Sequence, residues 1–579
     1  MPDVIEFDLA ADVEQDRLRI PFKDLPGFRW GHTSNRIITH AGLLRVYSRD
    51  SGSIIAPAVG RSGLRPDRRR RCLAAFQSGR HMSTPNSATI AAIDLGSNSF
   101  HMLVARTEGD TFRVVDRMRG MVRLAAGMSA DNQLNDRAVA RALSCLAQFG
   151  ERVSGLPADA VRVVGTNALR KARNSSHFIA QAESLLGHPI DIISGHEEAR
   201  LIYLGVSHGL DDEAAVRLVV DIGGGSTEII LGRRFDPLYM ESLHMGCVSH
   251  SARFFDDGAI TLARMYAAEL AARQELEPLE TVYRAIGWQS VIGASGTILA
   301  ARDIITGMGL SQDVVTMPAL TRIKQVVLDA GHVDKLILPG LPDERRAVFA
   351  GGLAILCATF DALGIDRMRV SDSALREGLL YDLLGRIHRE DVRERAVGEL
   401  AQRYHIDRAQ SARVETTALA LLDQVAQPWQ LAGEEARNLL RWAAALHEIG
   451  LAISHSQYHK HGGYLLTHLD MPGFATGEQR RLAALVRSHR RKVPVAELAS
   501  LPAAQATQIL RLGSILRLAG LLHRRRSDTA LPSITLTVED GNLRLRFPPA
   551  WLEAHALTQA DLEQEALFLK AAGIRLKFK

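Results

Sequence analysis

The sequence has little cysteine, no long apolar run and no signal-like start. Its four cysteines lie far apart without a CxxC pair, which argues against a disulfide framework or a zinc ribbon and fits a reducing compartment. No apolar run reaches the roughly 18 residues that a membrane helix needs, and the N-terminus lacks the charged and then apolar order of a signal peptide. We expect a cytoplasmic protein with no transmembrane segment, while peripheral contact with a membrane stays open.

An excess of charge of one sign is also lacking over most of the chain. The net charge is +5, and residues 1–81 alone hold 14 Lys/Arg and 9 Asp/Glu, which leaves 56 residues of each sign in the remainder. Affinity for a polyanion must therefore come from local clusters of cations and not from an overall field. No nucleic-acid partner is expected.

The chain of 579 residues exceeds what one hydrophobic core usually organises, so two to four domains are expected. Residues 1–81 show weak periodicity and contain the arginine run "RPDRRRRC". We interpret them as a flexible extension, or as the result of a start-site assignment made too early, with translation beginning at Met82. A basic arm for nucleic acid or membrane lipid is the functional alternative.

From Met82 onward, one pattern occurs twice. The segments "IDLGSNSFHMLVA" and "VDIGGGSTEIILG" each follow the order strand, glycine turn, strand, and they align without a gap. Asp94 then matches Asp221, Gly96 matches Gly223, and Ser99 matches Ser226. An internal duplication of a β-β-β-α unit explains this alignment. Strand patterns alternate with helices up to about residue 390, as an α/β architecture requires.

The two glycine turns have the composition of phosphate-binding loops. Glycine allows backbone N–H groups to approach an anion without a Cβ in the way, and hydroxyl and amide side chains add donors. The turns do not fit a Walker A loop or a GxGxxG fingerprint. The predicted phosphate-binding residues are Gly96, Ser97 and Asn98 in the first turn and Gly223, Gly224, Gly225, Ser226 and Thr227 in the second.

These segments resemble the exopolyphosphatase and guanosine pentaphosphate phosphohydrolase family, which belongs to the actin, sugar-kinase and heat-shock-70 superfold. The resemblance covers about Ala88 to Lys579 and is closer to the exopolyphosphatase branch than to shorter relatives. The motifs that carry it are "DLGSNSFH", "GTNALR", "SGHEEARLIYLG", "DIGGGSTE", "MGCVS", "GASGT", "LPGLPDERRAVFAGGLAIL" and "MRVSDSALREGLLYDLL".

The resemblance implies a fold class and a division into domains. The fold is α/β, with a duplicated actin-like, or ribonuclease H-like, two-domain core, then an all-α HD-like domain and a small C-terminal α+β domain. The expected boundaries are 1–81 for the extension, 82–212 and 213–389 for the two core domains, 390–527 for the helical domain and 528–579 for the last domain.

The resemblance also implies roles for individual residues. Glu198 matches the family's catalytic base. Asp221 and Glu228 match acids that bind Mg²⁺ and position water, Asp94 joins them as a metal-binding acid, and Arg170 matches a phosphate-binding arginine. Each has another interpretation from the residues alone. Glu198 stands at an apparent helix start, where acids are favoured anyway, Arg170 fits a solvated helix face, and Asp94 fits a residue that braces its loop.

Chemistry independently supports a hydrolytic site. Hydrolysis of a phosphoanhydride needs in-line water, a base near it and neutralisation of the phosphate oxygens. Carboxylates hold hard cations, so Mg²⁺ between Asp221 and phosphate would remove their repulsion. Glu228 has His101 as its counterpart in the first repeat. The duplication therefore lost its symmetry where an acid was gained. "GASGT", Gly293 to Thr297, fits either a nucleotide-binding turn or a packing turn.

The helical half carries an incomplete signature. "ALHEIGLAI" resembles the His-Asp motif of metal-dependent phosphohydrolases, but Glu448 replaces the aspartate and Gly520 stands where a final aspartate is usual. We therefore expect no active metal centre there, even with His405 as a further candidate ligand. Its cations are expected to form a track for polyphosphate, unless they are ordinary exposed charges. The track residues are His489, Arg490, Arg491 and Lys492.

The sequence thus predicts a Mg²⁺-dependent exopolyphosphatase that removes terminal phosphates processively from inorganic polyphosphate and forms a homodimer, as the family's relatives often do. The alternative is a 5′-phosphohydrolase of guanosine 5′-triphosphate 3′-diphosphate (pppGpp), which would use the same loops and acids. A non-catalytic sensor of polyphosphate or alarmone and a kinase of the same superfold are weaker alternatives.

Overall fold

The computed structural model describes residues 88–579 apart from 110, 211–214 and 388–390. Before residue 88 it describes five short strands, which are Val4–Ile5, Ile20–Pro21, Arg36–His40, Leu43–Ser48 and Ser51–Ile54. The chain divides into the units Met1–Ser83 and Thr84–Lys579, and all that follows concerns the second unit. The predictions of a flexible extension and of a start at Met82 fall outside the described residues.

The first core domain is built on a five-stranded sheet in the order β10-β9-β6-β7-β8. β6, β7 and β8 form an antiparallel meander, and β9 and β10 continue the sheet in parallel with β6. The buried apolar pattern of β6 ends at the first glycine turn. The strands are β6 (Thr89–Leu95), β7 (Phe100–Glu108), β8 (Thr111–Gly120), β9 (Val161–Gly165) and β10 (Asp191–Ile192).

The second core domain repeats this arrangement. β11, β12 and β13 form the antiparallel meander, and β14 and β16 extend the sheet in parallel, with β15 added at the edge. The strands are β11 (Val216–Ile222), β12 (Thr227–Arg233), β13 (Asp236–Leu243), β14 (Ser290–Ala294), β15 (Val314–Thr316) and β16 (Arg367–Val370). The predicted duplicated α/β core is therefore confirmed.

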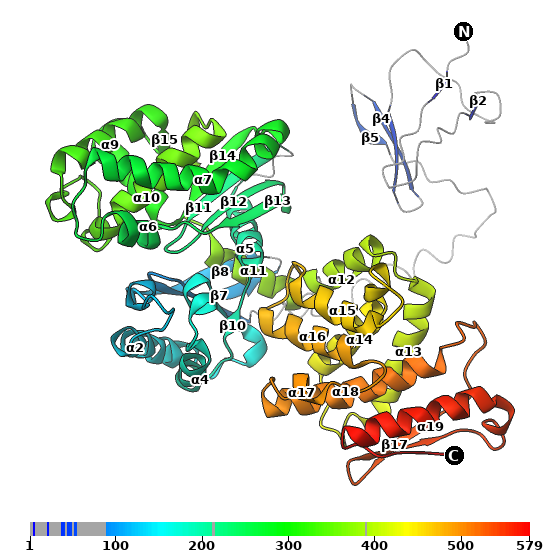
Figure 1. Ribbon diagram of the computed structural model, residues 1–579. Helices are drawn as coiled ribbons and strands as arrows, with labels where there is room; N and C mark the ends of the chain where they lie inside the picture. Colours follow the sequence, from blue (N-terminus) through cyan, green and yellow to red (C-terminus); the bar gives the residue numbers. More distant parts are fainter. Residues whose placement is uncertain are drawn as a thin grey trace, which may run out of the picture. The chain divides into compact units, whose positions relative to one another are not determined.

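Helices cover both faces of the first sheet. α2 (Asp136–Val153) and α4 (Ser175–Leu186) pack together over one face (Figure 1). α5 (Gly195–His208) and α11 (Leu375–Ile387) share a second apolar cluster with residues of both sheets. The predicted boundary at residue 389 thus assigns α11 to the second domain, whereas α11 packs against α5, β6 and β7 of the first.

The second domain surrounds its sheet with five helices and one large apolar cluster. These are α6 (Cys247–Phe254), α7 (Leu262–Ile286), α8 (Ser295–Gly307), α9 (Met317–Ala330) and α10 (Arg346–Leu363). Within the described residues, one helical segment, Asp343–Leu363, is long and apolar enough to cross a membrane by length and composition. Because 78% of its apolar window is buried, α10 is accounted for as a core helix.

The remaining chain forms a helical domain and a small sheet that share one core. Trp429, in the turn after α13, and Leu516 of α18 belong to the same apolar cluster as Leu536, Leu543 and Leu562 near the C-terminus, so the predicted division at residue 528 does not separate two cores. The elements are α12 (Val392–Arg403), α13 (Arg408–Val425), α14 (Glu434–Leu446), α15 (Tyr458–His468), α16 (Thr476–Ser488), α17 (Val495–Leu498), α18 (Ala503–Leu522), β17 (Thr535–Glu539), β18 (Asn542–Arg546), α19 (Ala556–Ala571) and β19 (Leu576–Phe578).

Candidate active site

A cavity of about 390 Å³ lies where the two glycine turns meet. The first turn follows β6 and the second follows β11, so the duplicated strands deliver equivalent loops to the same place. The lining includes residues 96–98, residues 223–226 and the acids Asp94, Glu198 and Asp221. The structure therefore brings together most of the residues that the sequence singled out.

The two turns touch, and this contact explains their small residues. A Cβ on Gly224 would lie 3.0 Å from the Ser97 Cβ, and one on Gly225 would lie 2.9 Å from Asn167 Oδ1. Asn167, in the short helix α3 (Asn167–Lys171), donates from Nδ2 to the Gly225 carbonyl at 3.1 Å. Within the second turn, the Gly223 N–H donates to the Ser226 carbonyl at 2.9 Å. Larger residues would push the turns apart.

The strand register sets a row of polar residues across each sheet. Asp221 pairs with Glu228 on β12, and Glu228 pairs with Ser242 on β13, so the three side chains share one face. Ser242 donates to Glu228 Oε1 at 2.8 Å. Glu228 is 1% exposed and is not part of the cavity lining. Asp221 lies between Glu228 and the cavity. The predicted direct contact of Glu228 with the attacking water is therefore not seen in this arrangement.

The equivalent row in the first sheet has one acid followed by a histidine and an arginine, where the second sheet has two acids and a serine. Asp94 pairs with His101, and His101 pairs with Arg119. Arg376 lies 3.3 Å from His101 Nδ1, and since a guanidinium only donates, Nδ1 accepts and Nε2 donates to Ser99 Oγ at 2.7 Å. Burial and then the charge of Arg376 lower the pKa of His101 to about 3, so it stays neutral.

Glu198 stands in the first turn of α5. Ser194 caps the start of this helix, because its side-chain hydroxyl accepts a hydrogen bond from the Glu197 N–H. Glu198 Oε2 accepts from both terminal nitrogens of Arg170, at 3.1 and 3.2 Å, and Arg170 also donates to the Ile193 carbonyl at 2.6 Å. Arg170 is not in the cavity lining. The structure thus gives Arg170 a contact with the predicted base where the sequence predicted a contact with phosphate.

The buried acids carry pKa values above their ordinary range. Burial and then the charge of Glu198 raise the pKa of Asp94 to about 8 and that of Asp221 to about 7. Burial raises the pKa of Glu198, with Arg170 opposing the rise, and burial followed by the charges of Glu198 and Asp221 raises that of Glu228 well above its usual value. A cation among these groups would hold them ionised.

The acids form an incomplete set of metal ligands. Across the described residues, no three His, Cys, Asp or Glu side chains are grouped closely enough to hold an ion. Asp94 Oδ1, however, is buried without a hydrogen-bond partner. One or two carboxylates completed by water and substrate phosphates are the usual ligand set of Mg²⁺. Asp94 and Asp221 fit that pattern.

The sequence prediction missed four cations that line the same cavity. Arg117, Arg119, Arg345 and Arg376 all border the cavity. Arg345 depends on Gly296, because a Cβ there would lie 1.5 Å from its guanidinium. Gly296, the second glycine of "GASGT", is therefore explained by its packing against Arg345. Arg345 and Arg376 both stand inside recognised motifs, "LPDERR" and "SALREG", so their positions were available as a signal.

The predicted polyphosphate track is not a continuous exposed strip. His489 is 5% exposed, and its Nδ1 lies 2.6 Å from the Val486 carbonyl. Arg490 and Arg491 border a separate cavity in the helical domain together with His447 and Glu448, and the same two arginines border a neighbouring cavity together with Lys492. His405, considered above as a ligand, borders neither of these two cavities.

Comparison with known proteins covers both halves of the chain. Residues 103–387 match the model of the Ppx/GppA phosphatase family, and residues 392–566 match Ppx/GppA phosphatase, domain III. A guanosine-5'-triphosphate,3'-diphosphate pyrophosphatase of Aeromonas hydrophila is 42% identical over 83% of this chain and 96% of its own. The protein of that name from Pseudoalteromonas translucida is 40% identical with the same coverage. An exopolyphosphatase structure from Cytophaga hutchinsonii aligns with TM-score 0.47 and 25% identity, covering 51% of this chain and 98% of its own.

These relatives correct the predicted substrate. The prediction of an exopolyphosphatase as the main activity is wrong, because curated relatives at 40–42% identity are named for the guanosine pentaphosphate. The motifs did not separate the two, since the same loops and acids serve a terminal phosphoanhydride on either molecule. The prediction of a hydrolase acting on phosphoric anhydrides is confirmed. The chain belongs to the Ppx/GppA phosphatase family.

Proposed function

We propose that this protein hydrolyses the terminal 5′-phosphate of guanosine 5′-triphosphate 3′-diphosphate. The observation that carries the proposal is the 40–42% identity, over 83% of this chain, to relatives named for that substrate. The cavity supports it, because two glycine turns, the acids Asp94, Glu198 and Asp221, and four arginines are suited to a phosphoanhydride bound end-on. The products are the 5′-diphosphate 3′-diphosphate and orthophosphate.

In the proposed reaction, Glu198 takes a proton from the attacking water. The water oxygen bonds to the terminal phosphorus as the bond to the bridging oxygen breaks. The bridging oxygen keeps that electron pair and leaves with the 5′-diphosphate of the nucleotide, and the terminal phosphate is released as orthophosphate. Arg170 fixes the carboxylate of Glu198 through two hydrogen bonds. The backbone of residues 96–98 and 223–226 binds the phosphate oxygens, and Arg376 and Arg345 offset their charge.

We further propose Mg²⁺ as the cofactor, held by Asp94 and Asp221 with Glu228 behind them. The unpartnered Asp94 Oδ1 and the raised pKa values of both acids support this assignment. When bound, the ion would supply charge neutralisation at the phosphate. A chelator such as EDTA should abolish phosphate release, and excess Mg²⁺ should restore it. Full activity in the chelator would contradict the assignment.

The substrate is tested by comparing kcat/KM for the guanosine pentaphosphate and for long-chain polyphosphate on one preparation. We expect a preference of at least about tenfold for the nucleotide, since the site must then recognise groups beyond the terminal phosphate. Equal values, or a preference for polyphosphate, would refute the proposed substrate. Phosphate transfer to ADP without hydrolysis would indicate a kinase instead.

A further inference from the structure

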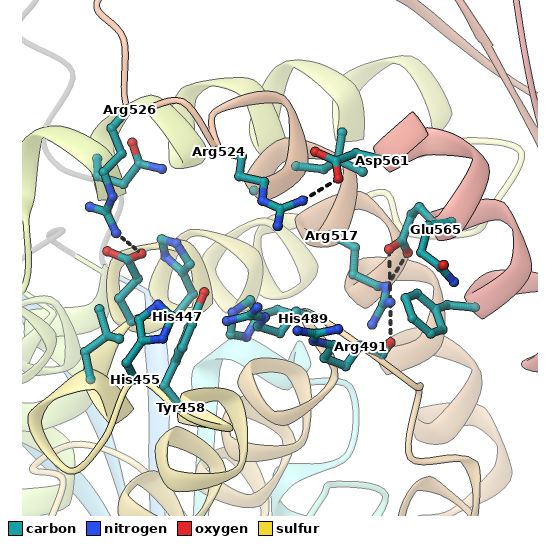
Figure 2. Close-up of a pocket in the computed structure, with 18 residues that line it drawn as sticks. His447, His455, Tyr458, His489, Arg491, Arg517, Arg524, Arg526, Asp561 and Glu565 are labelled. Carbon is teal, nitrogen blue, oxygen red and sulfur yellow. Dashed lines mark hydrogen bonds and ion pairs between the residues drawn. The ribbon is translucent and has the colours of Figure 1, made fainter. Parts of the chain in front are cut away.

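The helical domain contains a second cavity of about 390 Å³ that shares no lining residue with the first. It lies among the ends of α14 and α16, the start of α15, and residues of α18 and α19, and its polar side chains gather around one space (Figure 2). None of its residues takes part in the proposed hydrolysis. Its function therefore needs a separate explanation.

The lining of this cavity has more cations than anions. Each of its three carboxylates is ion-paired with an arginine of the same lining, as Arg526 with Glu448, Arg524 with Asp561 and Arg517 with Glu565 (Figure 2). Two arginines remain, Arg490 and Arg491, for which the described part of the chain offers no carboxylate partner. The guanidinium of Arg490 lies over the Tyr458 ring at 4.5 Å. Two uncompensated cations at a cavity favour an anionic ligand.

The loop that carries these two arginines is held in a fixed conformation. Arg491 has a φ of 62°, a left-handed value that is unfavourable for a residue with a side chain. Buried Arg517 donates to the Arg491 carbonyl and, at 2.6 Å, to the Ser488 carbonyl, while Glu565 fixes its guanidinium. Strain maintained by a buried ion pair is typical of a binding site.

Two buried imidazoles add hydrogen-bond acceptors to the same wall. His447 Nδ1 lies 2.7 Å from the Ala444 carbonyl, and His489 Nδ1 lies 2.6 Å from the Val486 carbonyl. A carbonyl can only accept, so each Nδ1 carries the proton and each Nε2 presents a lone pair. Burial lowers the pKa of both rings, which keeps them neutral. His489 Nε2 is buried with no partner among the described residues.

A ligand for this wall needs negative charge and also a proton to donate. Sulfate has no proton at neutral pH, and a phosphate monoester loses its second proton near pH 6, whereas orthophosphate still carries one. A divalent metal would suit the two imidazoles, but Arg490 and Arg491 repel it. We propose that the cavity binds orthophosphate, with Arg490 and Arg491 offsetting its charge and His489 Nε2 accepting a hydrogen bond from its P–OH group.

The arginines are tested by counting bound phosphate. Equilibrium dialysis of the full-length protein against radiolabelled orthophosphate at pH 8 should show one ion fewer per chain in the double variant Arg490→Gln/Arg491→Gln than in the wild type. The control Lys492→Gln/Arg525→Gln loses the same charge at two neighbouring exposed positions outside this lining and should bind as the wild type does. Equal stoichiometry in the wild type and the first variant would overturn the proposal. Circular dichroism and Tm verify that both variants fold.

The role of His489 Nε2 as a hydrogen-bond acceptor is tested by letting other anions compete with orthophosphate for the cavity. In the wild type, sulfate or a nucleoside 5′-monophosphate should displace orthophosphate from this site only at an excess of about tenfold or more, because neither fills the acceptor. His489→Leu keeps the arginines and should bring sulfate and phosphate to within about twofold of each other. Equal competition by sulfate in the wild type refutes the role of His489, and that measurement needs no variant to fold.

Discussion

At the scale of single residues, the proposed role of Glu198 as the base depends on how its carboxylate is held. The residue is 8% exposed, and its carboxylate has Arg170 as a bidentate partner. A base that is buried and ionised needs such a partner, because burial alone favours its neutral form. Arg170 therefore contacts the predicted base without bordering the cavity. Substitutions of Glu198 and of Arg170 should have different effects on the kinetics.

Replacing Glu198 by Gln should lower kcat by at least about a hundredfold, the range of a lost general base. Binding of the pentaphosphate should change little, because the glycine turns and arginines remain. Steady-state phosphate release and equilibrium binding check the two effects. Glu151→Gln, an exposed change on α2, is the matched control and should be silent. A Glu198→Gln enzyme with an unchanged rate would remove Glu198 as the base.

Replacing Arg170 distinguishes positioning of the base from binding of phosphate. If Arg170 orients Glu198, Arg170→Gln should lower kcat with little change in KM, and Arg170→Lys should recover part of the rate because one hydrogen bond survives. If Arg170 binds phosphate as the family resemblance implies, KM should rise instead. The split between kcat and KM decides between the two roles.

At the scale of elements, a close helix crossing positions Glu198. α5 and α11 meet through glycines, since a Cβ on Gly378 would lie 1.8 Å from the Leu201 carbonyl and one on Gly205 would lie 2.0 Å from the Ala374 carbonyl. Both contacts are with backbone, which cannot move aside as a flexible side chain can. The same α11 carries Arg376 into the cavity. Packing and site geometry are thus linked through one helix pair.

Gly378→Ala should therefore destabilise the protein by about 1–3 kcal/mol through overpacking. We expect a lower Tm, together with reduced activity as α5 moves. The matched change is Gly398→Ala in α12, where a Cβ would meet nothing within 4 Å. That variant should be neutral or more stable by up to about 1 kcal/mol, because alanine is the better helix former. Thermal unfolding of both variants tests the crossing.

At the scale of the whole molecule, a buried ion network joins the core to the helical domain. Arg200 on α5 bonds to Glu197 at 2.8 Å and to Asp382 on α11 at 2.5 Å. Asp382 also accepts from Arg386, which donates to the Gly473 carbonyl of the helical domain at 2.8 Å. Glu197 accepts from the Gly473 N–H at 2.9 Å. The first glutamate of "GHEEAR" thus anchors the helical domain, next to the predicted base.

Asp382→Asn should cost about 3 kcal/mol at neutral pH, because it leaves Arg200 and Arg386 buried with less compensation. The pKa of Asp382 is lowered by Arg386 and Arg200 against the effect of burial. The contribution of Asp382 to the free energy of unfolding is therefore complete above the ordinary pKa of about 3.9. It is lost progressively as the pH falls below that value. Urea midpoints at neutral pH and near pH 3 should show the difference between wild type and variant shrinking with acid. A constant difference would contradict this role.

The duplicated α/β core and both glycine turns could be predicted from the residues alone. Local patterns carry this information, because apolar strands followed by glycine-rich turns have only a few ways to fold. The turn between β17 and β18 is a further local feature, because Asp540 and Gly541 both adopt the positive φ that such a hairpin turn requires. The phosphoanhydride chemistry followed from the acids next to these turns.

The set of side chains that share a cavity could not be predicted in this way and follows from the packing of the folded chain. Glu228 lies behind Asp221 through strand register, Arg170 faces Glu198 and not the cavity, and Arg345 and Arg376 arrive from segments far along the chain. The same packing assigns α11 to the first domain and gives the helical and C-terminal segments one core. The physical reason is common to all of these. Contacts between residues distant in sequence depend on how whole elements pack, and local pattern does not specify that packing.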